Sequence, residues 1–328
     1  MKTVAFFDAK PYDKETFLQL NDDEINFRFF DNRLNKDTVS MTACCDAVCV
    51  FVNDTIDKAV IEKLEEYGVG MVALRCAGYN NVDLRAANGR IKVARVPAYS
   101  PHAIAEHTMG MVLTLNRRLH RAYIRTRDHN FSLEGLIGFD LYGKTVGIIG
   151  TGKIGLCFAD ICKGFGMRVI GFDPYKRDNF AGEYVDMQRL LSESDIISLH
   201  CPLTRENRHL INGETISHMK KGAFIINTSR GQLIDTAALI DGIKSGRVGA
   251  AGLDVYEEET NVFFEDLSEE IIRDDTLSTL ISLPNVLVTS HQAFLTREAL
   301  ESIAETTLKN LNAYFEGKPL ENEVSFMQ

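Results

Sequence analysis

A glycine-rich turn between an apolar run and a helical pattern constrains the fold of this chain more than any other feature. The letters GTGKIG at 150–155 follow the apolar run 145–149 and precede a helical pattern at 154–165. Asp173 comes after the next apolar run, eighteen residues beyond Gly155, where a ribose-binding carboxylate is expected. The sequence therefore predicts a dinucleotide site. It favours NAD over NADP, because the Asp173 carboxylate would repel a 2′-phosphate.

Each glycine of the turn has a separate physical role. Gly150 allows the tight turn, Gly152 lets the backbone approach a pyrophosphate, and Gly155 permits close packing of helix on strand. The start of the helix then offers free N–H groups and a positive dipole end to the phosphates. A purely structural turn is the alternative, and it is disfavoured because strand, helix and acid all occur in context.

Apolar runs and amphipathic stretches alternate along most of the chain, which predicts βαβ units and parallel sheets. The 328 residues suggest two domains at about 150 residues each. Expected strands lie at 3–7, 47–52, 70–74, 92–96, 144–150, 168–172, 195–200, 223–227, 248–253 and 286–289. Expected helices include 57–67, 102–121, 154–165 and 297–316.

Composition narrows the choice of partner and compartment. The formal charge of −10 argues against a nucleic-acid partner and against an anionic membrane surface. No signal peptide and no transmembrane stretch of about 20 apolar residues is evident. The seven cysteines show neither disulfide nor metal-ligand spacing, so we expect free thiols, no metal site and a cytoplasmic location.

Three later strands end in residues suited to proton transfer. One is followed by Arg230, the next by the acidic run Glu257–Glu259, and the last by His291. Open α/β sheets bind ligands at the carboxyl ends of their strands, so these groups are candidates for a reaction site. Each alone could be a surface charge or a loop residue, but together with a dinucleotide motif they favour catalysis.

The chain resembles, essentially end to end, the D-isomer-specific 2-hydroxyacid dehydrogenase family, and within it the fermentative D-lactate dehydrogenases. The motifs that carry the resemblance are RCAGYNNVD at 75–83, VPAYSP at 96–101, AEH at 105–107, GTGKIG at 150–155, NTSRG at 227–231, DVYEEE at 254–259 and SHQAF at 290–294. The resemblance implies NADH-dependent, reversible reduction of pyruvate to D-lactate. A bulkier 2-keto acid is the alternative substrate, and an NAD-sensing, corepressor-like binding protein is the alternative class of function.

The resemblance also implies catalytic roles. Arg230 would grip the carboxylate and carbonyl oxygen of the substrate, a contact that suits its planar fork. His291 would be the general acid in reduction and the base in the reverse direction. Glu259 would pair with His291 and favour the imidazolium; the family spacing selects it from three adjacent glutamates that physical reasoning alone leaves equivalent.

Further contacts follow from the same resemblance. Cofactor contacts are expected from Gly150, Gly152, Lys153, Ile154, Gly155, Asp173, Cys201, Pro202, Asn207, Thr228, Ser229, Arg230 and Asp254. Substrate contacts are expected from Phe51, Ala77, Gly78, Tyr99, Arg230, His291 and Phe294. Two aromatic walls, Phe51 and Phe294, would favour pyruvate over larger acids, although Phe51 could equally be an ordinary core residue. Leu295 departs from the tyrosine that relatives often carry.

The family fold implies two Rossmann-like or flavodoxin-like parallel-sheet domains with the active site in the cleft between them. Residues 1–100 and 298–328 would form a discontinuous substrate domain, and residues 101–297 the NAD-binding domain. Sequence pattern alone does not indicate that the last helix returns to the first domain. A homodimer or higher homo-oligomer formed through the cofactor domain is expected, with the stretch 102–121 as a candidate interface.

Overall fold

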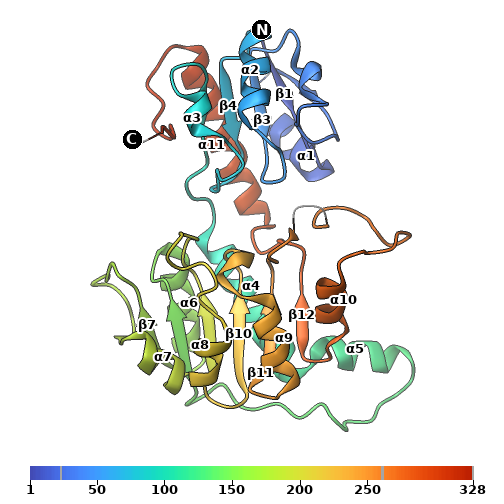
Figure 1. The fold of residues 1–328 in the computed structure, drawn as a ribbon, viewed down its shortest axis with the longest axis vertical. Coiled ribbons are helices and arrows are strands. Elements are labelled where there is room, and N and C mark those ends of the chain that lie inside the picture. The colour runs from blue at the N-terminus through green and yellow to red at the C-terminus, as the bar shows by residue number, and fades with distance from the viewer. Residues whose placement is uncertain (23, 260–261, 327–328) are drawn as a thin grey trace. The chain divides into compact units, whose positions relative to one another are not determined.

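The computed structural model describes residues 1–22, 24–259 and 262–326, and the chain divides into two compact units (Figure 1). The first unit combines Met1–Ser100 with Leu295–Gln328, and the second comprises Pro101–Phe294. Each unit is an α/β structure built on a parallel sheet, as the alternation of apolar runs and helical patterns predicts. The predicted fold class is confirmed.

The first unit is built around a five-stranded parallel sheet with the order β2-β1-β3-β4-β5. Its strands are β1 (Lys2–Phe6), β2 (Ile25–Phe29), β3 (Ala47–Val50), β4 (Met71–Leu74) and β5 (Lys92–Ala94). Its helices are α1 (Pro11–Leu20), α2 (Lys58–Glu66), α3 (Leu84–Ala87) and α11 (Arg297–Phe315), with a 3₁₀ turn η1 at Val39–Thr42. This strand order is that of flavodoxin-like sheets.

Helices cover both faces of the first sheet, because successive strand residues point to opposite sides. One face packs against Val60, Ile61 and Leu64 of α2. The other packs against α1 and α11, for example at Phe17 and Leu311. Burial on both sides explains why β3 and β4 are unbroken apolar runs, the signal by which a sequence reveals them.

Strand β2 is absent from the elements that the sequence predicts. It lies at the edge of the sheet and pairs only with β1, from Lys2↔Ile25 to Phe6↔Phe29. Its alternate residues Asn26 and Arg28 are exposed. An edge strand of this kind lacks the continuous apolar run of a central strand, which is why the pattern misses it.

The second unit holds a seven-stranded parallel sheet with the order β12-β11-β10-β9-β6-β7-β8. Its strands are β6 (Thr145–Ile149), β7 (Arg168–Phe172), β8 (Glu183–Tyr184), β9 (Ile196–Leu199), β10 (Ala223–Asn227), β11 (Val248–Leu253) and β12 (Val286–Val288). Its helices are α4 (Pro101–Arg117), α5 (Leu119–Arg127), α6 (Lys153–Gly164), α7 (Met187–Glu193), α8 (Gly213–His218), α9 (Thr236–Lys244) and α10 (Asp275–Ser282), with a 3₁₀ turn η2 at Gly231–Leu233. The order is that of dinucleotide-binding sheets extended by one strand, and it reverses between β6 and β9.

Two apolar layers flank the second sheet. On one face α4 and α6 contribute residues such as Met111 and Phe158. On the other face α7 to α10 contribute residues such as Leu190, Leu239 and Leu280. These layers fix the strands so that their carboxyl ends, where the predicted site residues follow, lie along one edge of the sheet.

The single helix predicted over 102–121 is wrong, because the structure has two helices, α4 and α5. The break falls at Arg118, whose φ of +51° is left-handed and cannot continue a helix. The connector beyond α5 packs against the end of α4: the Asn116 side chain bonds both backbone groups of Phe139, with distances of 2.7 and 2.9 Å. Within the described ranges, no helix is long and apolar enough to cross a membrane.

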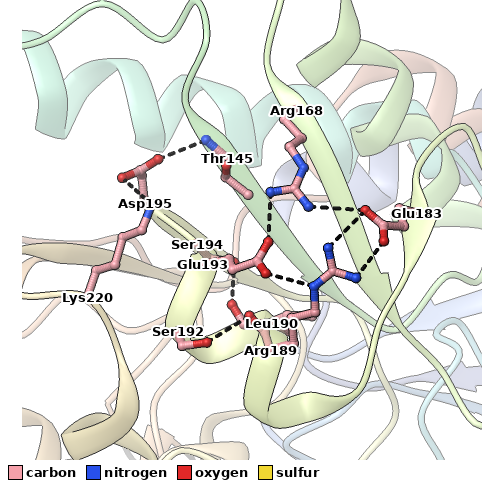
Figure 2. A network of polar contacts seen from close by, with 10 residues as sticks. All are labelled: Thr145, Arg168, Glu183, Arg189, Leu190, Ser192, Glu193, Ser194, Asp195 and Lys220. Atoms are coloured by element: carbon pink, nitrogen blue, oxygen red, sulfur yellow. Dashed lines mark hydrogen bonds and ion pairs between the residues drawn. The ribbon is translucent and has the colours of Figure 1, made fainter.

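Charged side chains link β7, β8 and α7 on the surface of the second unit (Figure 2). Arg168 contacts Glu193 at 2.7 Å and Glu183 at 3.1 Å, and Arg189 contacts the same two carboxylates at 2.7 and 2.6 Å. These groups are solvent-exposed, so each pair adds little stability and is screened by salt. Arg168 opens β7, so this network lies by the amino end of that strand, away from the glycine turn.

His200 follows β9 and is buried beneath the glycine turn. Its Nε2 lies 2.9 Å from the Ser198 hydroxyl, and its ring is 5.1 Å from the ring of Phe158. Burial lowers the pKa of His200 to about 3, so the folded protein holds this imidazole neutral.

We expect His200 to make the protein less stable as the pH falls. The unfolded chain binds a proton here below a pKa of about 6.5, whereas the folded chain does not, so unfolding is favoured as the pH drops below 6.5. The loss is about 2 kcal/mol between pH 6.5 and 5. Urea midpoints at the two pH values should therefore differ less for His200→Gln than for the wild type. The exposed His218→Gln is the control; an equal effect of both substitutions would contradict the assignment.

Candidate active site

The glycine turn after β6 has no room for a side chain at two of its glycines, and it has open space at the third. Gly150 has a left-handed φ of +94°, and a Cβ there would lie 2.6 Å from the carbonyl oxygen of His200. Gly155 packs so closely on the Gly150 carbonyl that a Cβ would overlap it. A Cβ on Gly152, by contrast, would meet no described atom within 4 Å. This open backbone beside the start of α6, at the point where strand order reverses, fits a bound pyrophosphate.

Asp173 follows β7 and is fixed beside the glycine turn. Its Oδ2 accepts hydrogen bonds from the Thr151 amide at 2.7 Å and the Thr151 hydroxyl at 3.2 Å. Its Oδ1 accepts the Tyr175 amide at 2.7 Å. The carboxylate is thus oriented without being fully buried, which suits recognition of a ribose next to the pyrophosphate.

The segment after β9 forms a turn that the side chain of Asn207 stabilises. Asn207 donates from Nδ2 to the Pro202 carbonyl at 2.7 Å, and its Oδ1 accepts the Thr204 amide at 2.7 Å. Burial raises the pKa of Cys201 to about 11, so this thiol is protonated at neutral pH. Asn207 therefore shapes the turn, and contacts of the turn with a cofactor stay a prediction.

Arg230 lies beyond β10 in a tightly packed segment. The Ser229 hydroxyl donates to the Leu199 carbonyl at 2.8 Å, and the Thr228 hydroxyl lies 3.1 Å from that of Thr108 on α4. Gly231 packs directly on the backbone joining Tyr256 to Glu257, where a Cβ would overlap it. The absence of a side chain at Gly231 therefore brings the segment of Arg230 against the acidic segment after β11.

His291 and Glu259 form the central polar pair of the second unit. Nδ1 of His291 lies 3.0 Å from Oε1 of Glu259, and both side chains keep about a fifth of their surface exposed. The second carboxylate oxygen, Oε2, accepts the Tyr256 amide at 3.0 Å, which fixes the orientation of Glu259. In the part of the chain that the structure describes, no group hydrogen-bonds Nε2 of His291, so this nitrogen is available to a substrate.

The backbone at His291 has a left-handed φ of +54°, which is unusual for a residue with a side chain. Asp254, at the end of β11, holds this conformation. Its carboxylate accepts the amides of Gln292 and Ala293 at 2.9 Å each, and its carbonyl accepts the His291 amide at 2.7 Å. Three consecutive amides of the segment therefore bond to one aspartate, which offsets the cost of the strained backbone.

Asp254 is itself buried and surrounded by donors. The Thr289 hydroxyl donates to Oδ1 at 2.5 Å, and Nε2 of His107 on α4 lies 3.5 Å from the same oxygen. Burial raises the pKa of Asp254, but hydrogen bonds from His107, Thr289 and the Ala293 amide lower it by more, so the net shift is downward. Asp254 thus stays ionised and supports the segment of His291, while direct contact with a cofactor stays a prediction.

The NAD binding domain model of the D-isomer specific 2-hydroxyacid dehydrogenases matches residues 109–293. The chain belongs to this family. It is 54% identical to a 2-hydroxyacid dehydrogenase homolog of Haemophilus influenzae over 98% of both chains. It is 53% identical to the D-lactate dehydrogenase of Escherichia coli, covering 98% of this chain and 99% of the relative. The solved pyruvate reductase of Chlamydomonas reinhardtii superimposes with a TM-score of 0.93 at 42% identity, over 98% of each chain. NAD is the cofactor of this dehydrogenase.

The predicted substrate residues of the first unit follow the ends of its strands. Phe51 comes directly after β3, Ala77 and Gly78 come after β4, and Tyr99 comes after β5. The structure joins two of these segments, because Nδ2 of Asn81 donates to the Phe51 carbonyl at 2.9 Å. In the second unit, Phe294 is buried close to Asp254, whose carboxylate binds the preceding residue.

The sequence did not indicate how two residues of the dehydrogenase support its site. The sequence assigns no role to His107, which lies 3.5 Å from Asp254 and 3.3 Å from Thr289. Gly231 ends the NTSRG motif, but the motif does not indicate that this glycine sets the closeness of two segments. The packing of α4 against β11 and β12 brings His107 to its partners. Only the folded chain could reveal either contact, because the partners are more than twenty residues apart in sequence.

Substitutions at two glycines of the turn should separate binding from folding. We expect Gly152→Ala to fold normally, since its Cβ meets open space, and to weaken NADH binding on the order of tenfold by obstructing the pyrophosphate. Gly155→Ala should instead lower the unfolding temperature, because its Cβ overlaps the Gly150 carbonyl. NADH fluorescence titration and thermal melts test the pair; normal NADH binding by Gly152→Ala would refute this site for the pyrophosphate.

Proposed function

We propose that this dehydrogenase reduces pyruvate to D-lactate with NADH, and that the reaction is reversible. Full-length similarity to the Escherichia coli D-lactate dehydrogenase supports the substrate. The observation that carries the chemistry is the 3.0 Å contact between Nδ1 of His291 and Glu259, which leaves Nε2 for the substrate. A bulkier 2-keto acid is the alternative substrate.

In the proposed reaction the second unit moves the proton. NAD, when bound in its reduced form, supplies the hydride that reaches the carbonyl carbon. Nε2 of His291 donates a proton to the carbonyl oxygen, giving the alcohol, and takes it back in the reverse direction. Glu259 accepts the hydrogen bond from Nδ1 and thereby stabilises the imidazolium before transfer. Arg230 binds the substrate carboxylate and polarises the carbonyl through its planar fork.

We further propose that the first unit, with residues 298–328 of the last helix and tail, is the substrate domain. Phe51, Ala77, Gly78 and Tyr99 would contact the keto acid from this unit, and Phe294 from the second. The backbone near Gly78 would receive the carboxylate, and the two phenylalanines would limit the space for the substrate side chain. Each excluded methylene corresponds to roughly 1–3 kcal/mol of discrimination.

The proposal is tested by following NADH absorbance with pyruvate and then determining the chirality of the lactate. We expect turnover, with D-lactate as product. His291→Ala should lose on the order of 10²–10⁴-fold in kcat and still bind NADH, because the proton donor is removed and the glycine turn is not. His218→Ala, an exposed histidine, is the control. L-lactate as product would refute the substrate orientation, and wild-type turnover by His291→Ala would refute the acid.

We also propose that two copies of the chain associate through the second unit. None of the nine residues of α5 is buried, and apolar side chains at 119–142 are exposed. They are Leu119, Tyr123, Ile124, Phe131, Leu133, Ile137 and Tyr142, each more than half exposed. An apolar surface of this extent is characteristic of an interface, and a second copy of the chain would bury it. The free cysteines agree with a reducing, cytoplasmic location for the dimer.

Mass measurement by light scattering tests the dimer. The wild type should have at least twice the mass of one chain, and Leu133→Lys with Ile137→Lys should shift it toward the monomer, because two charges enter an apolar contact. Ile271→Lys, at an equally exposed isoleucine outside this segment, should leave the mass unchanged. A monomeric wild type would contradict the proposal.

A further inference from the structure

The first unit buries a complete guanidinium group that the proposed reaction does not use. Arg75 directly follows β4 and is 1% exposed, which is rare for an arginine. Its Nη1 donates to the Phe7 carbonyl at 3.1 Å and its Nη2 to the Asp8 carbonyl at 2.7 Å. Nη2 also lies 3.5 Å from the carboxylate of Asp13. Arg75 is therefore fixed to the segment that follows β1.

The same guanidinium lies over two aromatic rings. Its central carbon is 4.6 Å from the ring centre of Phe6 and 4.7 Å from that of Phe51. Phe6 is a core residue of β1, whereas Phe51 follows β3 and is only partly buried. Cation–π attraction is strongest where water is excluded, as it is around Arg75. The cation thus connects the ring of Phe51 to the buried core of the sheet.

The backbone of Phe51 is held independently. Its amide donates to Oδ2 of Asp54 at 2.5 Å, and its carbonyl accepts Nδ2 of Asn81 at 2.9 Å. Burial raises the pKa of Asp54 to about 6, although Arg75 and the amides of Phe51 and Leu34 oppose the rise. These backbone contacts fix the position of the Phe51 main chain. The ring itself packs against the apolar cluster of the first unit, and the guanidinium of Arg75 covers part of it.

We propose that Arg75 is a positioning residue for substrate size: by holding the ring of Phe51, it keeps the side-chain pocket small. The inference rests on the proposed role of Phe51 in contacting the keto acid. Arginine suits this task because its flat, permanently charged group can contact two rings and three backbone or carboxylate acceptors at once. Lysine would keep the charge and lose the flat face. The ring of Phe51 would then lose one of the surfaces against which it packs, and larger substrates would fit.

The test is the ratio of kcat/KM for pyruvate to kcat/KM for 4-methyl-2-oxopentanoate, a branched keto acid. We expect Phe51→Leu and Arg75→Lys each to lower this ratio about tenfold, mainly through KM of the branched acid. In the double variant, Arg75→Lys should add nothing, because the ring on which it acts is gone. Arg28→Lys is the matched control, since Arg28 lies 5.4 Å from the ring of Phe30 elsewhere in the same unit.

The outcomes separate the inference from the proposed function. No effect of Phe51→Leu on the ratio would refute Phe51 as a pocket wall. A shift by Phe51→Leu with none by Arg75→Lys, or full additivity in the double variant, would refute the role of Arg75 alone. If Arg75→Lys does not fold, as judged by its NADH binding and melting, Asp13→Asn decides. It weakens one anchor of the same guanidinium and should lower the ratio less, in the same direction; an unchanged ratio would overturn the inference.

Discussion

The hydrogen bonds of one buried carboxylate, that of Asp254, hold the segment on which the proposed chemistry depends. His291 has a left-handed backbone, and such a conformation persists only where surrounding contacts determine it. Asp254 provides those contacts through its carbonyl and both carboxylate oxygens. Because the donors to this aspartate come from Thr289 after β12, from α4 and from the segment itself, the backbone that carries the imidazole is fixed by the fold of the second unit.

Close approach of backbone to backbone has a comparable importance in the second unit. Gly155 lies against the Gly150 carbonyl, and Gly231 lies against the peptide joining Tyr256 to Glu257. In both places the methyl group of an alanine would push apart two backbone segments that are in direct contact. The first contact shapes the glycine turn, and the second places the segment of Arg230 beside that of Glu259. Gly152 is the exception, because its open side leaves room for a ligand.

The two units handle buried charge in different ways. In the second unit the buried anion Asp254 is compensated by side-chain and backbone hydrogen-bond donors, and it holds the segment that carries His291. In the first unit the buried cation Arg75 is compensated by carbonyls and by the nearby carboxylates of Asp8, Asp13 and Asp54. Arg75 lies against the rings of Phe6 and Phe51, a contact that suits a cation which cannot lose its proton and so cannot serve in proton transfer.

The sequence by itself determined the class of fold, the dinucleotide turn and the types of residue at three strand ends. These signals are local: apolar runs mark strands buried on both faces, and glycine spacing marks a turn. The sequence pattern missed the edge strand β2, because the polar face of this strand is exposed. It also missed the break between α4 and α5, near which the side chain of Asn116 bonds to the backbone of Phe139. Only the tertiary structure decided which groups donate hydrogen bonds to Asp254, that His107 lies beside it, and that Arg75 is buried. In each case the partners are distant in sequence, and the energy of burying a charge depends on neighbours that only the folded chain assembles.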